Sequence, residues 1–198
     1  AIGAHPGFRD LIGFGRRAMP FTLPEMRHML AYQLGALQGI ATDLGHNVTH
    51  VSYHAAFGNA VTADADLAAA LAEVIHRNDP ALIVYAQPGT LVEQAARRRG
   101  LRTMALFLAD RAYRPDGGLV PRGQPGAVIH DHAALAARVT RFVEAGEVVC
   151  AEGSVLQVPA KGILVHSDTE GSADLLRIVR ETVTGLGVTI APSTEIAD

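Results

Sequence analysis

The sequence contains few of the residues on which several kinds of protein chemistry depend. Its single cysteine, Cys150, excludes an internal disulfide framework and a zinc site built from thiolates. Lysine occurs only at position 161, so a mechanism that needs a catalytic lysine has one candidate. No apolar run approaches the roughly 20 residues of a membrane-spanning helix. The opening residues also lack the basic start and apolar stretch of a signal peptide.

An excess of positive charge is also missing. The 17 basic and 20 acidic residues give a formal net charge of −3, which provides no large basic surface for nucleic acid. The 198 residues are 48% hydrophobic and 19% charged, which is typical of a globular domain with a real core. We therefore expect one domain over residues 1–198 in a soluble, cytoplasmic protein that uses neither nucleic acid nor membrane as a partner. The composition leaves a homo-oligomer possible as an assembly state.

Apolar segments alternate with amphipathic segments along the chain. Thr22 and Glu25 form a capping-box pattern before a helical repeat of apolar residues, and residues 81–85 form a continuous apolar run that suits a strand buried on both faces. The alternation predicts an α/β architecture with a mostly parallel sheet. Helices are expected at 23–44, 65–77, 91–99, 133–145 and 172–184, and strands at 50–53, 81–85, 102–107, 162–165 and 188–190.

Polar residues follow the predicted strands where functional groups of parallel sheets gather. His5, His54, Asp110 and His166 each come directly after a short apolar segment. Working groups in such folds lie at the carboxyl ends of the strands. The glycine- and proline-rich stretch 110–129 has no predicted element, and long irregular loops in compact domains are usually functional. These residues are the first candidates for a site.

Each candidate also has a structural interpretation. His5 and His54 could act as a general base or line a pocket, or they could cap a turn and pack in a loop. Asp110 could orient a histidine while Arg111 captures a substrate carboxylate, or the two could pin the long loop as an ion pair. Asp168 could serve a site with His166 or cap the helix that follows.

Three further patterns carry weaker signals. Ser167 is not expected to be a nucleophile, because no G-x-S-x-G turn surrounds it. Residues 13–17 (GFGRR) resemble a phosphate loop only faintly, since the Walker spacing and lysine are missing. His130-Asp131-His132 suggests metal ligands, but a helix-capping Asp131 between two exposed histidines is the favoured interpretation.

Several long phrases resemble the LamB/YcsF family, the A subunits of bacterial ATP-dependent 5-oxoprolinase. The matching phrases extend along the whole chain. They are residues 1–8 (AIGAHPGF), 10–17 (DLIGFGRR), 32–37 (YQLGAL), 109–113 (ADRAY), 116–117 (DG), 119–122 (LVPR) and 125–130 (PGAVIH).

The resemblance implies a fold, an activity and partners. The fold would be an irregular, seven-stranded (βα) barrel of the glycoside hydrolase and deacetylase type. The activity would be opening of the 5-oxoproline lactam to L-glutamate with ATP, together with subunits B and C. The implied catalytic residues are His5, His54, Asp110 and His166, with either His5 or His54 as the base. The implied substrate-binding residues are Arg111, Arg122, Asn59 and Asp168. The resemblance does not decide whether a divalent metal ion is a cofactor.

The sequence also departs from the family pattern. Two phrases that open the family, Asn-Cys-Asp-Leu-Gly-Glu and Gly-Phe-His-Ala-Gly-Asp, would precede Ala1, so the N-terminal strands of the barrel are expected to be missing. Ser52 stands where the family has lysine, and Leu106 where it has glutamate. We interpret these two changes as the joint loss of a charge pair. The alternatives are therefore a catalytically degenerate paralogue that binds a small molecule or acts as a scaffold, and a metal-dependent amide or sugar deacetylase by analogy of fold.

Overall fold

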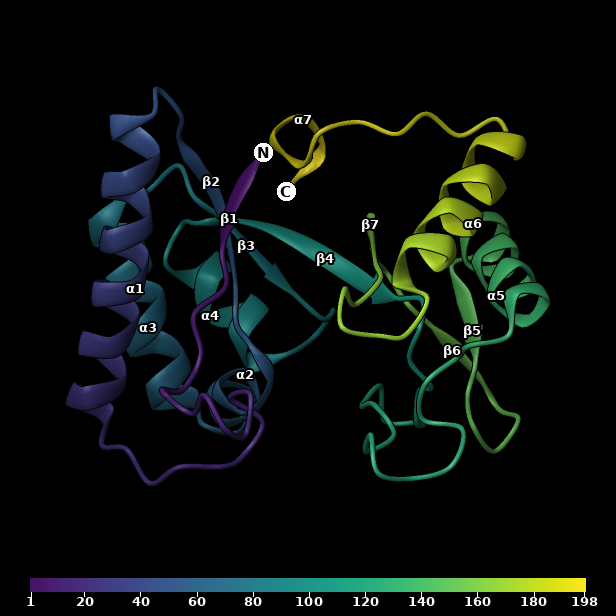
Figure 1. The fold of residues 1–198 in the computed structure, drawn as a ribbon, viewed down its shortest axis with the longest axis horizontal. Helices are drawn as coiled ribbons and strands as arrows, with labels where there is room; N and C mark the ends of the chain where they lie inside the picture. The colour runs from purple at the N-terminus through teal and green to yellow at the C-terminus, as the bar shows by residue number, and fades with distance from the viewer. The chain divides into compact units, whose positions relative to one another are not determined.

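The computed structural model describes residues 1–198, which form two compact units. Unit 1 comprises Ala1–Ala105 together with Pro192–Asp198, and unit 2 comprises Leu106–Ala191. Strand β4 (Arg102–Leu108) begins in unit 1 and ends in unit 2. Both units contain parallel strand pairs and helices (Figure 1), so the predicted α/β class is confirmed. Closure of seven strands into a barrel, the missing N-terminal strands and the single domain stay predictions.

Unit 1 is a parallel sheet with strand order β1-β2-β3-β4, accompanied by five helices. Its other strands are β1 (Ile2–Ala4), β2 (Val48–Ser52) and β3 (Ile83–Ala86). Its helices are α1 (Leu23–Asp43), α2 (Ala55–Ala63), α3 (Ala65–Asn78), α4 (Leu91–Arg98) and α7 (Ser193–Ile196). Buried apolar side chains from the strands, from the first three helices and from the segment before β3 fill one core, among them Leu34, Val51, Phe57, Ile75 and Leu82.

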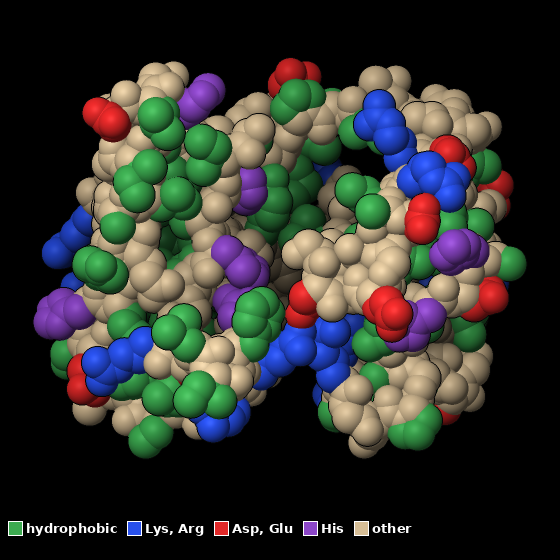
Figure 2. Space-filling model, viewed as in Figure 1, with side chains coloured by type: hydrophobic (Ala, Val, Ile, Leu, Met, Phe, Trp, Pro, Cys, Tyr) green, Lys and Arg blue, Asp and Glu red, His purple; other side chains and the backbone are tan.

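Helix α1 shows how the sequence sets an element boundary. The Thr22 side chain accepts a hydrogen bond from the Glu25 backbone, and the Glu25 carboxylate accepts one from the Thr22 backbone at 2.8 Å. This reciprocal capping satisfies N–H groups that the first turn leaves unpaired. Leu30 and Leu34 face the core, whereas Tyr32 is 77% exposed. Figure 2 shows hydrophobic side chains on the outer surface of α1.

Unit 2 pairs the end of β4 in parallel with β7 (Gly162–Leu164). Strands β5 (Glu147–Val149) and β6 (Val155–Gln157) form a separate antiparallel hairpin. Helix α5 (His132–Ala145) packs against α6 (Ser172–Gly185). The stretch 110–129 contains no helix or strand, as expected, and its β-pairing consists of two isolated bridges, Arg111 with Val128 and Tyr113 with Leu119.

One element of the sequence-based prediction is wrong and others were missed. Residues 188–190 form no strand: Val188 and Ile190 are 43% and 49% exposed and pair with no neighbouring strand. β-Branched residues form a strand only where a neighbouring strand pairs with them, and this segment has no such pairing. Helix α2 and the β5–β6 hairpin were not predicted. None of the helices combines the length and apolar character needed to cross a membrane.

Candidate functional site

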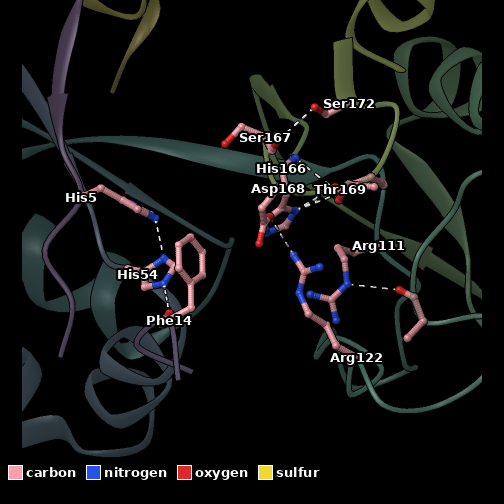
Figure 3. A network of polar contacts seen from close by, with 12 residues as sticks. His5, Phe14, His54, Arg111, Arg122, His166, Ser167, Asp168, Thr169 and Ser172 are labelled. Atoms are coloured by element: carbon pink, nitrogen blue, oxygen red, sulfur yellow. Dashed lines mark hydrogen bonds and ion pairs between the residues drawn. The ribbon is translucent and has the colours of Figure 1, made fainter. Parts of the chain in front are cut away.

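The four candidate catalytic residues follow the carboxyl ends of parallel strands, as expected. His5 comes directly after β1, and His54, Asp110 and His166 each come two residues after β2, β4 and β7. The structure joins His5 to His54 within unit 1 (Figure 3). It joins Asp110 to His166 within unit 2. The predicted residues therefore form two side-chain pairs, which are described separately.

The histidine pair of unit 1 is held at both ends by backbone carbonyls. His5 Nδ1 lies 2.7 Å from the Ser52 carbonyl oxygen, and His54 Nε2 lies 2.7 Å from the Phe14 carbonyl oxygen. The remaining ring nitrogens, His5 Nε2 and His54 Nδ1, lie 3.0 Å apart. Because a carbonyl oxygen only accepts, both outer ring nitrogens are N–H donors. The tautomers of both rings are thereby fixed.

A tight turn over residues 10–17 places the Phe14 carbonyl. Asp10 is buried, and its carboxylate accepts from the Gly13 backbone at 3.0 Å and from Arg17 Nε at 2.9 Å. Phe14 and Gly15 both have positive φ angles, of 52° and 64°, which turn the chain back toward His54. Arg17 lowers the pKa of Asp10 to about 2 through this hydrogen bond, against the opposing effect of burial.

The same turn does not fit a phosphate loop. The backbone N–H groups of Gly13, Gly15 and Arg16 all donate within the turn, to the Asp10 carboxylate, the Asp10 carbonyl and the Gly13 carbonyl. A phosphate-binding loop needs such groups directed at its ligand. The resemblance of residues 13–17 to a phosphate loop is therefore not supported, and the turn holds His54 instead.

Two glycines leave the room that the His54 ring occupies. A Cβ on Gly15 would lie 2.9 Å from His54 Cδ2, and one on Gly7 would lie 3.1 Å from His54 Cβ. Gln33 of α1 fixes the Gly7 segment from the other side, since it accepts from the Gly7 N–H at 3.1 Å and donates to the Gly7 carbonyl at 3.0 Å. Helix α1 thus braces the chain that carries His5.

Asp110 is the centre of the second pair. Its side chain is fully buried and accepts from His166 Nδ1 at 2.9 and 3.1 Å, from the His166 backbone at 3.3 Å and from Thr169 Oγ1 at 2.9 Å. Burial acts to raise the pKa of Asp110, but the hydrogen bonds from His166 and Thr169 outweigh it and hold the pKa below its usual value. A carboxylate on Nδ1 leaves the Nε2 lone pair of His166 for proton transfer.

The predicted substrate-binding residues occupy varied settings. Arg111 is buried and donates to the carbonyls of Ala127 at 3.1 Å and Val120 at 2.6 Å, so it pins the long loop. Arg122 and Asp168 form a partly exposed ion pair at 3.8 Å. Asn59 lies exposed on α2. Their roles toward a substrate stay predictions.

The site offers little to a metal ion within either unit, where no group of three or more His, Cys, Asp or Glu side chains converges. Asp131 caps α5 by accepting from the Ala134 N–H at 2.7 Å, which accounts for the His130-Asp131-His132 pattern. Of the residues that hold the two pairs, sequence reasoning missed Asp10, Thr169 and the carbonyl of Phe14. The only signal in the sequence was the pair of glycines that flank Phe14, Gly13 and Gly15, which are typical of a tight turn.

Histidines and a buried aspartate follow the carboxyl ends of parallel strands here, where α/β proteins place their binding and catalytic groups. The LamB/YcsF family model matches residues 1–198, so the chain belongs to that family, as its motifs predicted.

The relatives of the chain carry consistent names. It is 50% identical over 196 residues to the 5-oxoprolinase A subunit 2 of Agrobacterium fabrum, covering 99% of this chain and 77% of the relative. It is 47% identical over 195 residues to the 5-oxoprolinase A subunit of Pectobacterium atrosepticum, covering 98% and 76%. The lactam utilization protein from Thermus thermophilus superposes with a TM-score of 0.87 at 36% identity, over 96% of this chain and 76% of that protein. The family's opening phrases before Ala1 stay a prediction.

Proposed function

We propose that the protein is the A component of a 5-oxoprolinase, which opens the lactam of 5-oxoproline to L-glutamate with ATP and with subunits B and C. The names of relatives at 47–50% identity support this class of reaction. The observation that carries the proposal is the buried Asp110 on His166 Nδ1, because it makes a histidine that is oriented for proton transfer.

Opening a lactam makes specific demands on side chains. Water adds to the ring carbonyl carbon, the C–N bond breaks, and the departing nitrogen takes a proton. ATP supplies the driving force: its γ-phosphoryl group goes to the carbonyl oxygen with release of ADP. C–N cleavage then leaves an acyl phosphate, which a second water hydrolyses to glutamate and phosphate. In place of His5 or His54, which we expected to supply the base, His166 is the proposed base for the water, since Asp110 fixes its Nδ1–H and stabilises the imidazolium that forms. Arg122 is the proposed ligand of the substrate carboxylate, with Asp168 orienting its guanidinium.

The two departures from the family pattern do not disrupt the described contacts. Ser52 contributes its backbone carbonyl to His5, and any residue at this position would offer the same group. Leu106 is 7% exposed within β4, where an apolar side chain needs no partner. The intact pairs therefore favour an enzyme over a degenerate scaffold.

The test is glutamate release from 5-oxoproline and ATP by the chain assembled with its B and C subunits. His166→Ala and His54→Ala should each lower the rate roughly 10²–10⁴-fold, the usual effect of losing an acid or base. His130→Ala and His46→Ala remove exposed histidines of units 2 and 1 and should keep the rate. Absence of turnover by the unaltered complex, with turnover when the equivalent component of a relative replaces this chain, would reject the proposal.

A further inference from the structure

The contact between the two histidines of unit 1 depends on how many protons their four ring nitrogens carry. His5 Nδ1 and His54 Nε2 each carry a hydrogen, because each faces a carbonyl oxygen. In a neutral imidazole the other nitrogen carries only a lone pair. Two neutral rings would therefore direct two lone pairs at each other over the 3.0 Å between His5 Nε2 and His54 Nδ1.

One proton between these nitrogens converts the repulsive contact into a hydrogen bond. The pair then carries three protons on four nitrogens and a single positive charge. Hydrogen bonds with a charged partner are shorter and stronger than neutral ones. The rings meet edge to face, with centroids 4.9 Å apart and planes at 70°, so the contact is made at the ring edges, where the nitrogens lie.

The turn over residues 10–17 is what prevents a simpler arrangement. If His54 moved its hydrogen from Nε2 to Nδ1, it could donate to His5 as a neutral ring, but its Nε2 lone pair would then face the Phe14 carbonyl at 2.7 Å. The turn cannot easily withdraw that carbonyl. Asp10 ties it at Gly13 and Arg17, and the Gly15 carbonyl accepts from the Ala56 N–H at 3.2 Å.

We infer that His5 and His54 share one proton, and that Asp10 is the positioning residue that enforces this by fixing the Phe14 carbonyl on His54 Nε2. The inference deepens the proposed function and takes its catalytic meaning from it. A histidine pair that already holds an extra proton is suited to act as a general acid, the role that the departing lactam nitrogen requires. The protonation state of the pair can be measured in the protein without substrate.

The experiment reads the ring nitrogens directly. The full chain is labelled with ¹⁵N in histidine, and NMR assigns protonated and unprotonated nitrogens of His5 and His54 at neutral pH, after treatment with a chelator. The expected spectrum shows N–H at His5 Nδ1 and at His54 Nε2, and a third proton coupled to the two remaining nitrogens. In His5→Ala the third proton should be lost, with His54 left as a neutral ring protonated at Nε2.

Asp10→Ala tests the positioning role. Release of the turn should convert His54 to a mixture of tautomers and remove the third proton from the pair. Asp116→Ala is the matched control, because Asp116 also accepts from a glycine N–H, that of Gly118 at 2.9 Å, and pairs with an arginine, Arg114. It should leave the spectrum of the pair unchanged. Circular dichroism checks that each variant is folded, and Asp10→Asn replaces Asp10→Ala if that variant is not.

Three results would overturn the inference. A spectrum with two neutral rings in the unaltered chain would show that the pair shares no proton. An Asp10 variant with unchanged tautomers would show that Asp10 does not position the pair. Saturable binding of Zn²⁺ that shifts both inner nitrogens, with no third proton in the chelated protein, would show that the pair is a metal ligand set. Loss of glutamate release alone bears on the proposed function, because the spectrum is recorded without substrate.

Discussion

His166 Nδ1 lies 2.9 Å from Asp110 Oδ1 and 3.1 Å from Asp110 Oδ2, so one ring nitrogen faces both oxygens of a fully buried carboxylate. The arrangement fixes which end of the imidazole is available for chemistry. The negative charge of Asp110, and not only its shape, would also stabilise the protonated form of His166.

Asp110→Asn tests the importance of that charge. The amide keeps the volume but cannot stabilise an imidazolium, and it can rotate to present its NH₂ to His166. We expect glutamate formation to fall roughly 10²–10⁴-fold. The measurement is the steady-state rate of the assembled complex. Asp116→Asn, in the exposed part of the loop, should keep the rate; an equal loss in both variants would indicate that the loop as a whole matters.

Acid should weaken the turn that holds His54. The hydrogen bond from Arg17 lowers the pKa of Asp10 from 3.8 to about 2 in the folded chain. A carboxyl group with a lowered pKa stabilises the fold above its unfolded value, and this contribution is lost as the pH falls toward the folded value. The difference in Tm between the unaltered chain and Asp10→Asn should therefore shrink between about pH 4 and pH 2. A constant difference would contradict the assignment.

Gly15→Ala separates backbone strain from contact with His54. Gly15 has a φ of 64°, and its missing Cβ would lie 2.9 Å from the ring. Gly45 has a φ of 73° and no atom within 4 Å of its missing Cβ, so Gly45→Ala carries the strain alone. Gly45→Ala should lose about 1 kcal/mol of unfolding free energy from backbone strain, and Gly15→Ala should lose more because its Cβ also meets His54. Only Gly15→Ala should also lower the rate, by roughly 10²-fold, because it displaces the His54 ring that we propose to be catalytic.

Arg102→Ala tests how residues 192–198 are tied to unit 1. The Nη2 atom of Arg102 donates to the carbonyl oxygen of Thr194 at 2.9 Å and to that of Ala197 at 3.1 Å. Hydrogen bonds from charged groups contribute about 1.5–3 kcal/mol, so we expect a loss near the lower bound at this partly exposed position. Urea denaturation measures it. Arg141→Ala, which removes a surface ion pair with Glu147, should cost less than about 1 kcal/mol.

The sequence predicted the elements whose signals are local. Thr22 and Glu25 mark the start of α1, Asp131 marks the start of α5, and the buried run ending at Leu108 marks β4. The strand-end rule also located His5 and His166. Each of these depends on neighbours in the sequence or on a general property of parallel sheets.

The missed features depend on distant contacts. The Phe14 carbonyl matters only because residue 54 reaches it, and the Ser52 carbonyl only because residue 5 does. Backbone groups leave no trace in residue type. Val188 and Ile190 show the opposite error, since a favourable local composition found no strand to pair with.

The path of the chain through the two units has a consequence for biosynthesis. Unit 2 is inserted between β4 and the segment that begins at Pro192, and Thr103 of β4 exchanges backbone hydrogen bonds with Asp198 at 2.6 and 2.9 Å. A ribosome delivers these partners 95 residues apart. Unit 2 can therefore be complete and emerging while unit 1 still lacks its closing segment, so a nascent chain stalled before Pro192 would expose an unfinished edge of β4 to chaperones.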